Sequence, residues 1–483
     1  MPDRKKYLAV LFGSATYLTL CHPAAALNLG FDGHLFLESS DNVEGANVGE
    51  EQNGVIQSGL LGVYGEQRSQ LVDAAFRGEL DTRKVVSDED SDLSTTTRFL
   101  GAAEFKLTPR SWRWYIGDIL GGIRNDDGIQ PIDDNELIRR NVLVTGPSFA
   151  YDVEGVSRTR ARVLYVHQSQ DDVDLDRLYN ANFNYERDAA RGNYYGFRLS
   201  NIYTDVAEVD ADDATADTAT GESEAGFVND DYNRTAVSAY YNRRLGFYQL
   251  LGELGTTRYE AEDDSLTGFG ALLRLSRQLG EQSLFSVALR QSLSDQSLSA
   301  IESLIASGDD AVGVAAETDG FFEEIRLGLD YSYQGKLSGF DVGGGVAQLD
   351  YQALSSMMSS EEIIDREDRQ KGFAYVSWSQ QLTSQLLADV GVSYESQDYD
   401  NLSDHSDSTL ISARFIYDLT NSFSLQLGFT HDTASGVRTD FNTGVGVEND
   451  IDITENRVSL GLRWQPPSRA SQNLTVELKS LLR

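Results

Sequence analysis

Apolar and polar residues alternate through most of this chain in segments of about ten residues, a period of two that predicts β-strands. The stretch 421–432 shows the pattern plainly. Phe423, Leu425, Leu427 and Phe429 fall on one face, and small or polar residues fill the other. The segment Arg457–Trp464 repeats the arrangement, so both segments predict a strand with one apolar and one polar face.

The polar face favours a closed barrel over a soluble sandwich. A soluble two-layer sheet would pack its apolar face on a second layer and leave open edges. Here a small, polar face recurs strand after strand, which suits a wet lumen inside a lipid-facing wall. We predict an all-β fold, a single transmembrane antiparallel up-and-down β-barrel of about 20 strands, with 16 or 18 left open.

Short and long connections alternate along the chain, which orients the predicted barrel. The short connections carry basic residues, namely Arg68, Arg110, Arg158, Arg187, Arg191, Arg243, Arg244 and Lys336. The long ones carry acidic runs, as in residues 88–92, 171–176 and 205–231. We therefore expect short periplasmic turns, long acidic extracellular loops, and both ends of the mature chain on the periplasmic side.

The N-terminus has the layout of a secretory signal peptide. Arg4, Lys5 and Lys6 precede an apolar run over 7–20, and Ala24-x-Ala26 fits a small-residue cleavage site. We predict a signal peptide over 1–26, cleavage near Ala26, and a bacterial outer-membrane location. A lipoprotein anchored at Cys21 is the alternative. The barrel would span 27–465, and 466–483 would be a C-terminal extension or the last strand.

Composition narrows the possible functions. The formal net charge of −36 becomes −38 once the signal peptide is removed, and so acidic a surface excludes nucleic-acid binding. Cys21 is the sole cysteine, so the mature chain has no disulfide and no thiol chemistry. Apolar residues reach only 40% with a mean hydropathy of −0.36, as alternating strands allow.

One acidic run has the spacing of oxygen ligands for a divalent cation. Asp171, Asp172, Asp174 and Asp176 lie one or two residues apart, as carboxylates do in calcium loops. The glycine and distal glutamate of an EF-hand loop are missing. The alternative is a solvated charge run that divalent cations bridge loosely at an anionic lipid surface. We otherwise predict no cofactor, with at most loosely bound calcium or magnesium at the acidic loops.

Nothing in the sequence assembles a catalytic site. The mature chain has four histidines, His34, His167, His405 and His431, and no Gly-x-Ser-x-Gly nucleophile elbow. The sequence of His431, Asp432 and Ser435 defines no triad geometry, because triads are recognised in space. We therefore predict that the protein is not an enzyme.

Arginines on the polar phase of the strands are candidates for contact with a transported solute. They are Arg160, Arg162, Arg198, Arg274 and Arg414. A charged lumen tunes selectivity among solutes. Alternatively, basic residues fill turns and bind phospholipid head groups on the periplasmic side. A register slip of one residue would move any of these side chains to the lipid face.

The segment Trp112–Pro147 resembles a known family. Its marks are Trp112, Trp114, Asp118, Asn141, Val142, Thr145, Gly146 and Pro147, with Pro131 between its halves. They resemble a β-barrel porin family of outer-membrane proteins associated with exopolysaccharide biosynthesis and PEP-CTERM protein-sorting systems. The remainder of the chain matches only as barrel pattern. The resemblance implies a part in the secretion of a surface polysaccharide, as an outer-membrane conduit.

Two positions depart from a simple strand pattern. Pro147 lacks the backbone N–H, so we expect a bulge or a strand start at Gly146-Pro147, with 141–145 either folded inward as a constriction or entering an ordinary strand. Trp464 would serve as a terminal aromatic residue, yet Pro466 and Pro467 follow it. The tail leaves the strand count open.

Three functions remain from the sequence. The first is a non-enzymatic channel that takes part in exopolysaccharide secretion. The second is a general or substrate-selective diffusion porin for small solutes, and the third is a structural or adhesive surface barrel. The expected partners are outer-membrane lipid and lipopolysaccharide, a polysaccharide or small solutes, the barrel-insertion machinery and periplasmic export components.

Overall fold

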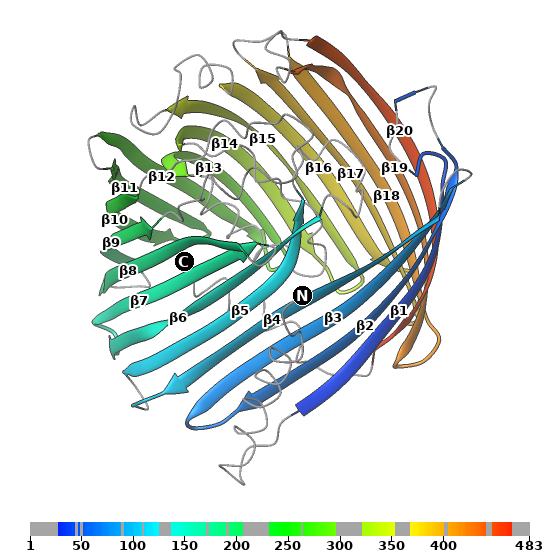
Figure 1. The fold of residues 1–483 in the computed structure, drawn as a ribbon. Helices are drawn as coiled ribbons and strands as arrows, with labels where there is room; N and C mark the ends of the chain where they lie inside the picture. Colours follow the sequence, from blue (N-terminus) through cyan, green and yellow to red (C-terminus); the bar gives the residue numbers. More distant parts are fainter. Residues whose placement is uncertain are drawn as a thin grey trace.

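The computed structural model is a closed β-barrel of twenty antiparallel strands in up-and-down order (Figure 1). It describes residues 28–43, 47–48, 52–87, 91–108, 111–124, 137–170, 173–189, 193–205, 231–261, 264–295, 321–352, 368–399, 404–440 and 447–465. The strands are β1 Asn28–Ser40, β2 Gly54–Arg68, β3 Val72–Ser87, β4 Ser91–Lys106, β5 Trp112–Arg124, β6 Leu137–Val153, β7 Ser157–Gln170, β8 Val173–Ala189, β9 Asn193–Asp205, β10 Tyr232–Leu245, β11 Tyr248–Glu260, β12 Ser265–Gly280, β13 Ser283–Asp295, β14 Phe321–Gln334, β15 Ser338–Gln352, β16 Arg369–Gln381, β17 Leu386–Tyr399, β18 His405–Asp418, β19 Phe423–Asp440 and β20 Val447–Trp464.

The first and last strands close the barrel. β1 pairs with β20 in an antiparallel register that runs from Gly33 opposite Trp464 to Ser40 opposite Arg457. This pairing joins the two outer strands of the sheet over Gly33–Ser40 and closes the barrel, as lipid requires. The predicted fold class is confirmed, and the strand count settles at 20. The segments 1–27 and 466–483 lie outside the described residues.

Glycines with positive φ and side-chain hydroxyl groups stabilise the short turns. Gly155 and Gly246 take positive φ values of 68° and 64° in tight turns, a conformation that glycine adopts without steric cost. At other short turns a hydroxyl accepts a hydrogen bond from the first strand residue. The amide of Val72 donates to Ser69 Oγ at 2.9 Å, and that of Leu386 donates to Thr383 Oγ1 at 3.0 Å. These turns fix the register of each hairpin.

The outward face is apolar and exposed. Leu35, Leu61 and Leu254 each show more than 60% of their surface. Aromatic side chains gather on this face near the short-turn end, among them Trp112, Trp114, Trp378, Phe423 and Trp464. Such an exterior suits lipid, with aromatic residues at the interface. Within the described ranges, no helix has the length and apolarity to cross a membrane.

Adjacent aromatic residues near the strand ends, such as Tyr194 and Tyr195, do not all lie on the lipid-facing side. Strand alternation instead divides them: Tyr195 and Tyr241 face outward, whereas Tyr194 and Tyr240 face the lumen. Phe321 is buried inside the long-loop end. Adjacent residues of a strand point to opposite faces, so a pair contributes one ring to each side.

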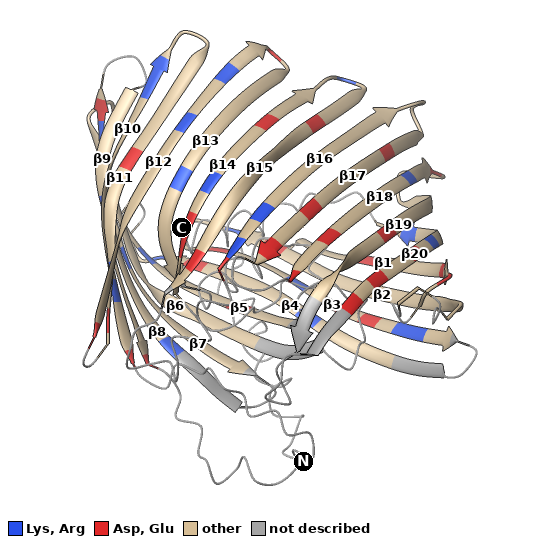
Figure 2. Ribbon diagram, turned by 90° about the horizontal axis from the view of Figure 1, so that it is seen from above, with Lys and Arg blue, Asp and Glu red and all other residues tan. Residues whose placement is uncertain are grey.

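Charged side chains recur along the strands around the barrel (Figure 2). The inward ones include a buried group at the β1–β3 wall, where Arg77 Nη2 lies 3.1 Å from Asp32 Oδ2 and Arg77 Nε lies 2.5 Å from Glu79 Oε1. Asp32 is fully buried and Arg77 nearly so. The Arg77–Asp32 pair joins β3 to β1 across β2, and the Arg77–Glu79 pair lies within β3.

Candidate functional site

The five arginines expected to contact solute all lie on the inward phase of their strands. Four of them are flanked by an exposed apolar residue on the outward phase, as Val163 flanks Arg162 and Leu199 flanks Arg198, and Arg160 shares the phase of Arg162 two residues away. Arg160 and Arg162 lie on β7, Arg198 on β9, Arg274 on β12 and Arg414 on β18. The register is therefore the one that places them in the lumen.

The barrel brings three of these arginines to a row of asparagines on β8. Asn182 is the register partner of Arg162, and Asn184 is the partner of both Arg160 and Arg198. Asn182 Nδ2 donates to Asn180 Oδ1 at 2.5 Å along the same face. Arg274 and Arg414 lie on other parts of the wall.

Tyr240 on β10 spans the neighbouring strand to reach this row. Its hydroxyl donates to Asn184 Oδ1 at 2.8 Å and lies 3.5 Å from Glu186 Oε2. Between them, Gly196 on β9 leaves room for the ring, since a Cβ there would approach Tyr240 Cζ to 2.7 Å. Glu186 also accepts from Arg158 Nη1 at 3.1 Å. The tyrosine therefore lies along the wall instead of projecting across the lumen.

An arginine and a glutamate complete the same network. Arg198 Nη1 donates to both oxygens of Glu253 at 3.0 and 3.2 Å. Ser238 Oγ donates to Glu253 Oε1 at 2.6 Å, and the Arg198 guanidinium carbon lies 4.6 Å from the centre of the Tyr240 ring. Asn242 Nδ2 donates to Tyr194 OH at 2.9 Å. We call the side chains of β7–β11 that share these contacts the polar wall. They are Arg158, Asn184, Glu186, Tyr194, Arg198, Ser238, Tyr240, Asn242 and Glu253.

Sequence reasoning missed most of the polar wall. Sequence reasoning singled out neither Tyr240 nor the asparagines of β8 as lumen residues. A signal was present, because Asn180, Asn182 and Asn184 recur at every second position. That spacing places three amides on one face of a strand.

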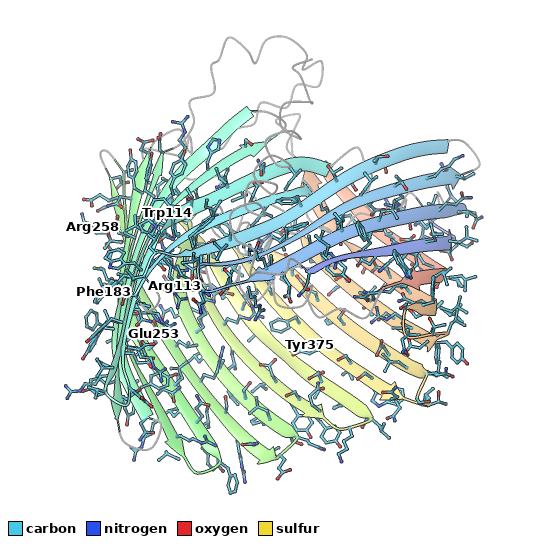
Figure 3. The ribbon with its side chains drawn as sticks, turned by 90° about the horizontal axis from the view of Figure 1, so that it is seen from below. Arg113, Trp114, Phe183, Glu253, Arg258 and Tyr375 are labelled. Carbon is cyan, nitrogen blue, oxygen red and sulfur yellow. The ribbon has the colours of Figure 1, made fainter. Side chains whose placement is uncertain are left out.

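A second polar region lies on β14–β18. Tyr375 OH donates to Asp330 Oδ1 at 2.9 Å, and Figure 3 shows Tyr375 on the wall of β16. Arg414 Nη2 lies 3.1 Å from Asp389 Oδ2. Arg326 stacks its guanidinium 4.5 Å from the centre of the Phe373 ring. Aromatic faces and charge pairs thus line this part of the lumen too.

Part of the inner face is apolar, which the expectation of a uniformly polar lumen did not include. The inward cluster consists of Ile119, Val142, Val144, Leu164, Val166, Leu178 and Ile202 on β5–β9. All are buried to 4% exposure or less. The cluster lies toward the long-loop end of these strands, beyond the polar wall.

The residues of the Trp112–Pro147 motif divide between the two faces. Trp112 and Trp114 are exposed on the outer face, and Trp114 Nε1 donates to Thr145 Oγ1 at 3.0 Å. Asp118 lies opposite Gly101 and Leu143 on that same outward phase. Asn141 shares the outward phase, whereas Val142 is fully buried in the inward apolar cluster. The motif is largely a feature of the outer wall.

The expected interruption at Gly146-Pro147 takes another form. β6 runs unbroken from Leu137 to Val153, so the segment 141–145 neither begins a strand nor folds inward as a loop. The β6–β7 ladder skips only positions 146 and 147. A Cβ on Gly146 would lie 2.0 Å from the Val163 carbonyl oxygen, so the close approach of β7 requires glycine.

The described ends of β13 and β14 nearest the long connection, at Leu293 and Phe321, bend over the inner face of the neighbouring strands, and we call these strand ends the β13–β14 tip. The β12–β13 ladder stops at Ala271 opposite Gln291, yet a Cβ on the inward Gly268 would lie 2.6 Å from Leu293 Cβ. The Phe321 ring centre on β14 is 5.5 Å from that of Tyr232 on β10. Four strand spacings along a wall amount to about 19 Å. The tip therefore crosses inside the barrel and narrows its long-loop end.

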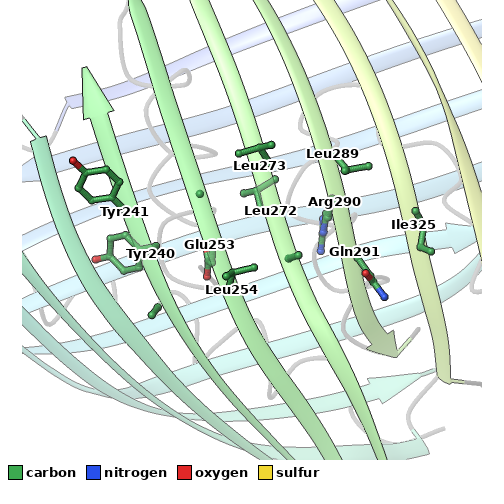
Figure 4. Close-up of a pocket in the computed structure, with 13 residues that line it drawn as sticks. Tyr240, Tyr241, Glu253, Leu254, Leu272, Leu273, Leu289, Arg290, Gln291 and Ile325 are labelled. Carbon is green, nitrogen blue, oxygen red and sulfur yellow. The ribbon is translucent and has the colours of Figure 1, made fainter. Parts of the chain in front are cut away.

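The pocket on β10–β14 belongs mainly to the outer surface. Leu254, Leu273, Leu289 and Ile325 line it (Figure 4), together with the small residue Gly252. Its lining is largely apolar and faces the side that meets lipid. We therefore place the functional site on the inner face.

The proposed calcium ligands fall at the limit of the described chain. Residues 171–172 lie outside it, and the side chains of Asp174 and Asp176 are likewise outside the described part of β8. Elsewhere in the described chain, no three His, Cys, Asp or Glu side chains come together as metal ligands.

Comparisons with known proteins find similarity of fold alone. No family model matches the chain, and no curated protein matches it. Solved structures that it resembles include the FrpB iron transporter of Neisseria meningitidis, at 11% identity and a TM-score of 0.48 over 90% of this chain and 81% of that one. The siderophore receptor PirA of Pseudomonas aeruginosa gives 11% identity and 0.47 over 90% and 80%, respectively. OmpT of Vibrio cholerae gives 10% and 0.32 over 92% and 98%. Functional assignment therefore depends on the chain's own residues.

Proposed function

We propose that this protein is an outer-membrane channel that takes part in exopolysaccharide secretion, and that it acts without a chemical step. The observation that carries the proposal is the polar wall. It places hydroxyl, amide, guanidinium and carboxylate groups beside the Tyr240 ring over five consecutive strands.

The chemistry of the wall suits a sugar polymer. Sugar hydroxyls can replace hydrogen bonds of similar strength, such as the one between Tyr240 and Asn184, so each exchange has a small net free energy. Contacts that are weak and repeated let a chain slide, because conduction requires binding that also releases. Barrels of 16–18 strands leave an aqueous channel, so a barrel of twenty strands is wide enough to hold an aqueous channel beside the polar wall.

The resemblance of Trp112–Pro147 to exopolysaccharide-associated barrels supports the same role. Its residues lie mostly on the outer wall, so they do not contact a polymer in the lumen or select it. Residues of the lumen would select the polymer, since Arg160, Arg162 and Arg198 lie beside the asparagine row there.

A pair of adjacent tyrosines provides the test in cells. Deletion of the gene should abolish surface glycan while uptake of small solutes continues. Complementation with wild type or Tyr241→Ala should restore the glycan, since Tyr241 faces outward. Tyr240→Ala should restore it poorly at equal amounts of folded barrel. Full restoration by both variants would contradict the role of the polar wall, and intact glycan in the deletion strain would end the proposal.

A diffusion porin for small solutes is the competing function, and liposome swelling separates the two. Vesicles that hold the purified barrel would swell quickly in small neutral sugars if the protein were a general porin. We expect slower swelling than an unobstructed barrel would give, with small sugars still passing, because the β13–β14 tip narrows the long-loop end without closing it to a sugar chain. Rapid swelling together with an intact surface glycan in the deletion strain would favour the porin.

A further inference from the structure

We infer that the lumen holds a binding site for anionic sugars on β12–β14, formed by Arg274, Arg290 and Arg326. The inference rests on the proposed function and names its substrate class, a polysaccharide that carries carboxylate, sulfate or phosphate groups. The three side chains lie on the inward phase of consecutive strands and are exposed there.

The register places like charges side by side. Arg290 is directly opposite Arg326 in the β13–β14 ladder. Arg274 is opposite Ala288, two residues before Arg290 on the same face. Side chains that oppose one another in a ladder have Cβ atoms about 5 Å apart, and like charges in that position are destabilising. An anion between them would remove this repulsion.

The protein supplies little counter-charge at this position. Within the described ranges, neither Arg274 nor Arg290 forms an ion pair, and Arg326 reaches only Glu324, at 4.0 Å. Glu253, diagonal to Arg274 in the register, is held by Arg198 and Ser238.

The positive charge of the β12–β14 arginines contrasts with the acidic composition of the whole chain. The sequence has 76 acidic against 40 basic residues, and two other lumen arginines are paired closely with carboxylates. Arg198 lies 3.0 Å from Glu253, and Arg414 lies 3.1 Å from Asp389. The β12–β14 cluster is therefore a local positive region in a strongly negative protein.

The geometry favours an oxyanion on a sugar over an isolated ion. A guanidinium presents a planar fork of donors that matches carboxylate, sulfate and phosphate groups. The Phe373 ring, which stacks on Arg326, adds an aromatic face beside the donors. Figure 4 shows Arg290 between Leu289 and Gln291 on β13, close to Leu272 of β12. Apolar and cationic groups together fit a charged sugar ring.

Planar-bilayer recording of the purified full-length barrel tests the inference. The probes are dextran sulfate and neutral dextran of matched size, added on each side, and a KCl gradient that reports ion selectivity. We expect dextran sulfate to block the wild-type current at lower concentration than neutral dextran does. Arg290→Gln should weaken the sulfate block about tenfold, as loss of one charge-assisted hydrogen bond implies, and shift the reversal potential toward cations.

A matched variant controls for charge alone. Lys336→Gln removes the same charge from the exposed turn between β14 and β15, and it should leave the sulfate block unchanged. Arg290→Lys keeps the charge without the planar fork and should fall between wild type and Arg290→Gln. Heat-modified migration on gels verifies that each variant folds.

The outcomes separate the two proposals. Equal block by both dextrans, or an unaltered sulfate block in Arg290→Gln, would overturn the anionic-sugar site and leave the channel proposal standing. Intact surface glycan in the gene-deletion strain would overturn the channel proposal, whatever the dextrans do.

Discussion

The hydroxyl of Tyr240 on β10 donates a hydrogen bond to Asn184 Oδ1 on β8, 2.8 Å away and across the whole width of β9. Gly196 is the register partner of both Tyr240 and Glu186, so its missing side chain opens the path for the ring. This contact holds the Tyr240 ring, which is only 4% exposed, flat within the inner wall.

Removal of the hydroxyl should change polymer contact without unfolding the barrel. Tyr240→Phe keeps the ring and leaves Asn184 Oδ1 free to bond to water, so we expect a stability change of about 1 kcal/mol or less. Neutral dextran should dwell longer in the lumen, because the freed amide becomes available to sugar hydroxyls. Single-channel dwell times measure this, with Tyr241→Phe as the outward control. Equal dwell times in all three proteins would refute the prediction.

Glycine at position 196 should be essential to wall packing. Gly196→Ala would place a Cβ 2.1 Å from the Tyr185 carbonyl oxygen, and backbone cannot move aside as a side chain can. Overpacking of this kind costs about 1–3 kcal/mol. The temperature at which the folded band disappears on gels should fall. Gly252→Ala, whose Cβ would meet no atom within 4 Å, should keep the wild-type temperature.

Release of the β13–β14 tip should widen the channel. Phe321 packs against Tyr259 with ring centres 4.5 Å apart and is buried to 4% exposure. Phe321→Ala removes this anchor, so unitary conductance and its fluctuations should both rise. Phe269→Ala, which truncates an exposed outward ring on β12, should leave conductance unchanged. A lower or unaltered conductance in Phe321→Ala would show that the tip does not limit the current.

The buried charged residues Asp32, Arg77 and Glu79 should contribute more to the free energy of unfolding than an exposed ion pair does. Arg77→Met would leave the fully buried Asp32 carboxylate without its cation, and such a loss costs about 3–5 kcal/mol. Arg258→Met breaks an exposed pair with Glu260 and should cost about 0–1 kcal/mol. Urea unfolding in lipid vesicles compares the two variants. Equal midpoints would show that the buried group contributes little.

The sequence by itself determined the barrel, its strand phase and the alternation of short and long connections. A two-residue period fixes which face each side chain takes, and a slip of one residue would expose every apolar side chain to the lumen. For that reason Arg160, Arg162, Arg198, Arg274 and Arg414 could be placed on the inward phase from local pattern alone.

Only the tertiary structure decided which inward side chains meet. Tyr240 reaches Asn184, and Arg290 opposes Arg326, because ladder register joins residues that lie 56 and 36 positions apart in the chain. The inward bend of the β13–β14 tip likewise depends on contacts between Phe321 and the rings of Tyr259 and Tyr232, three and four strands away. Alternation is a local property of one strand, whereas these contacts depend on how curvature and register combine around the closed sheet.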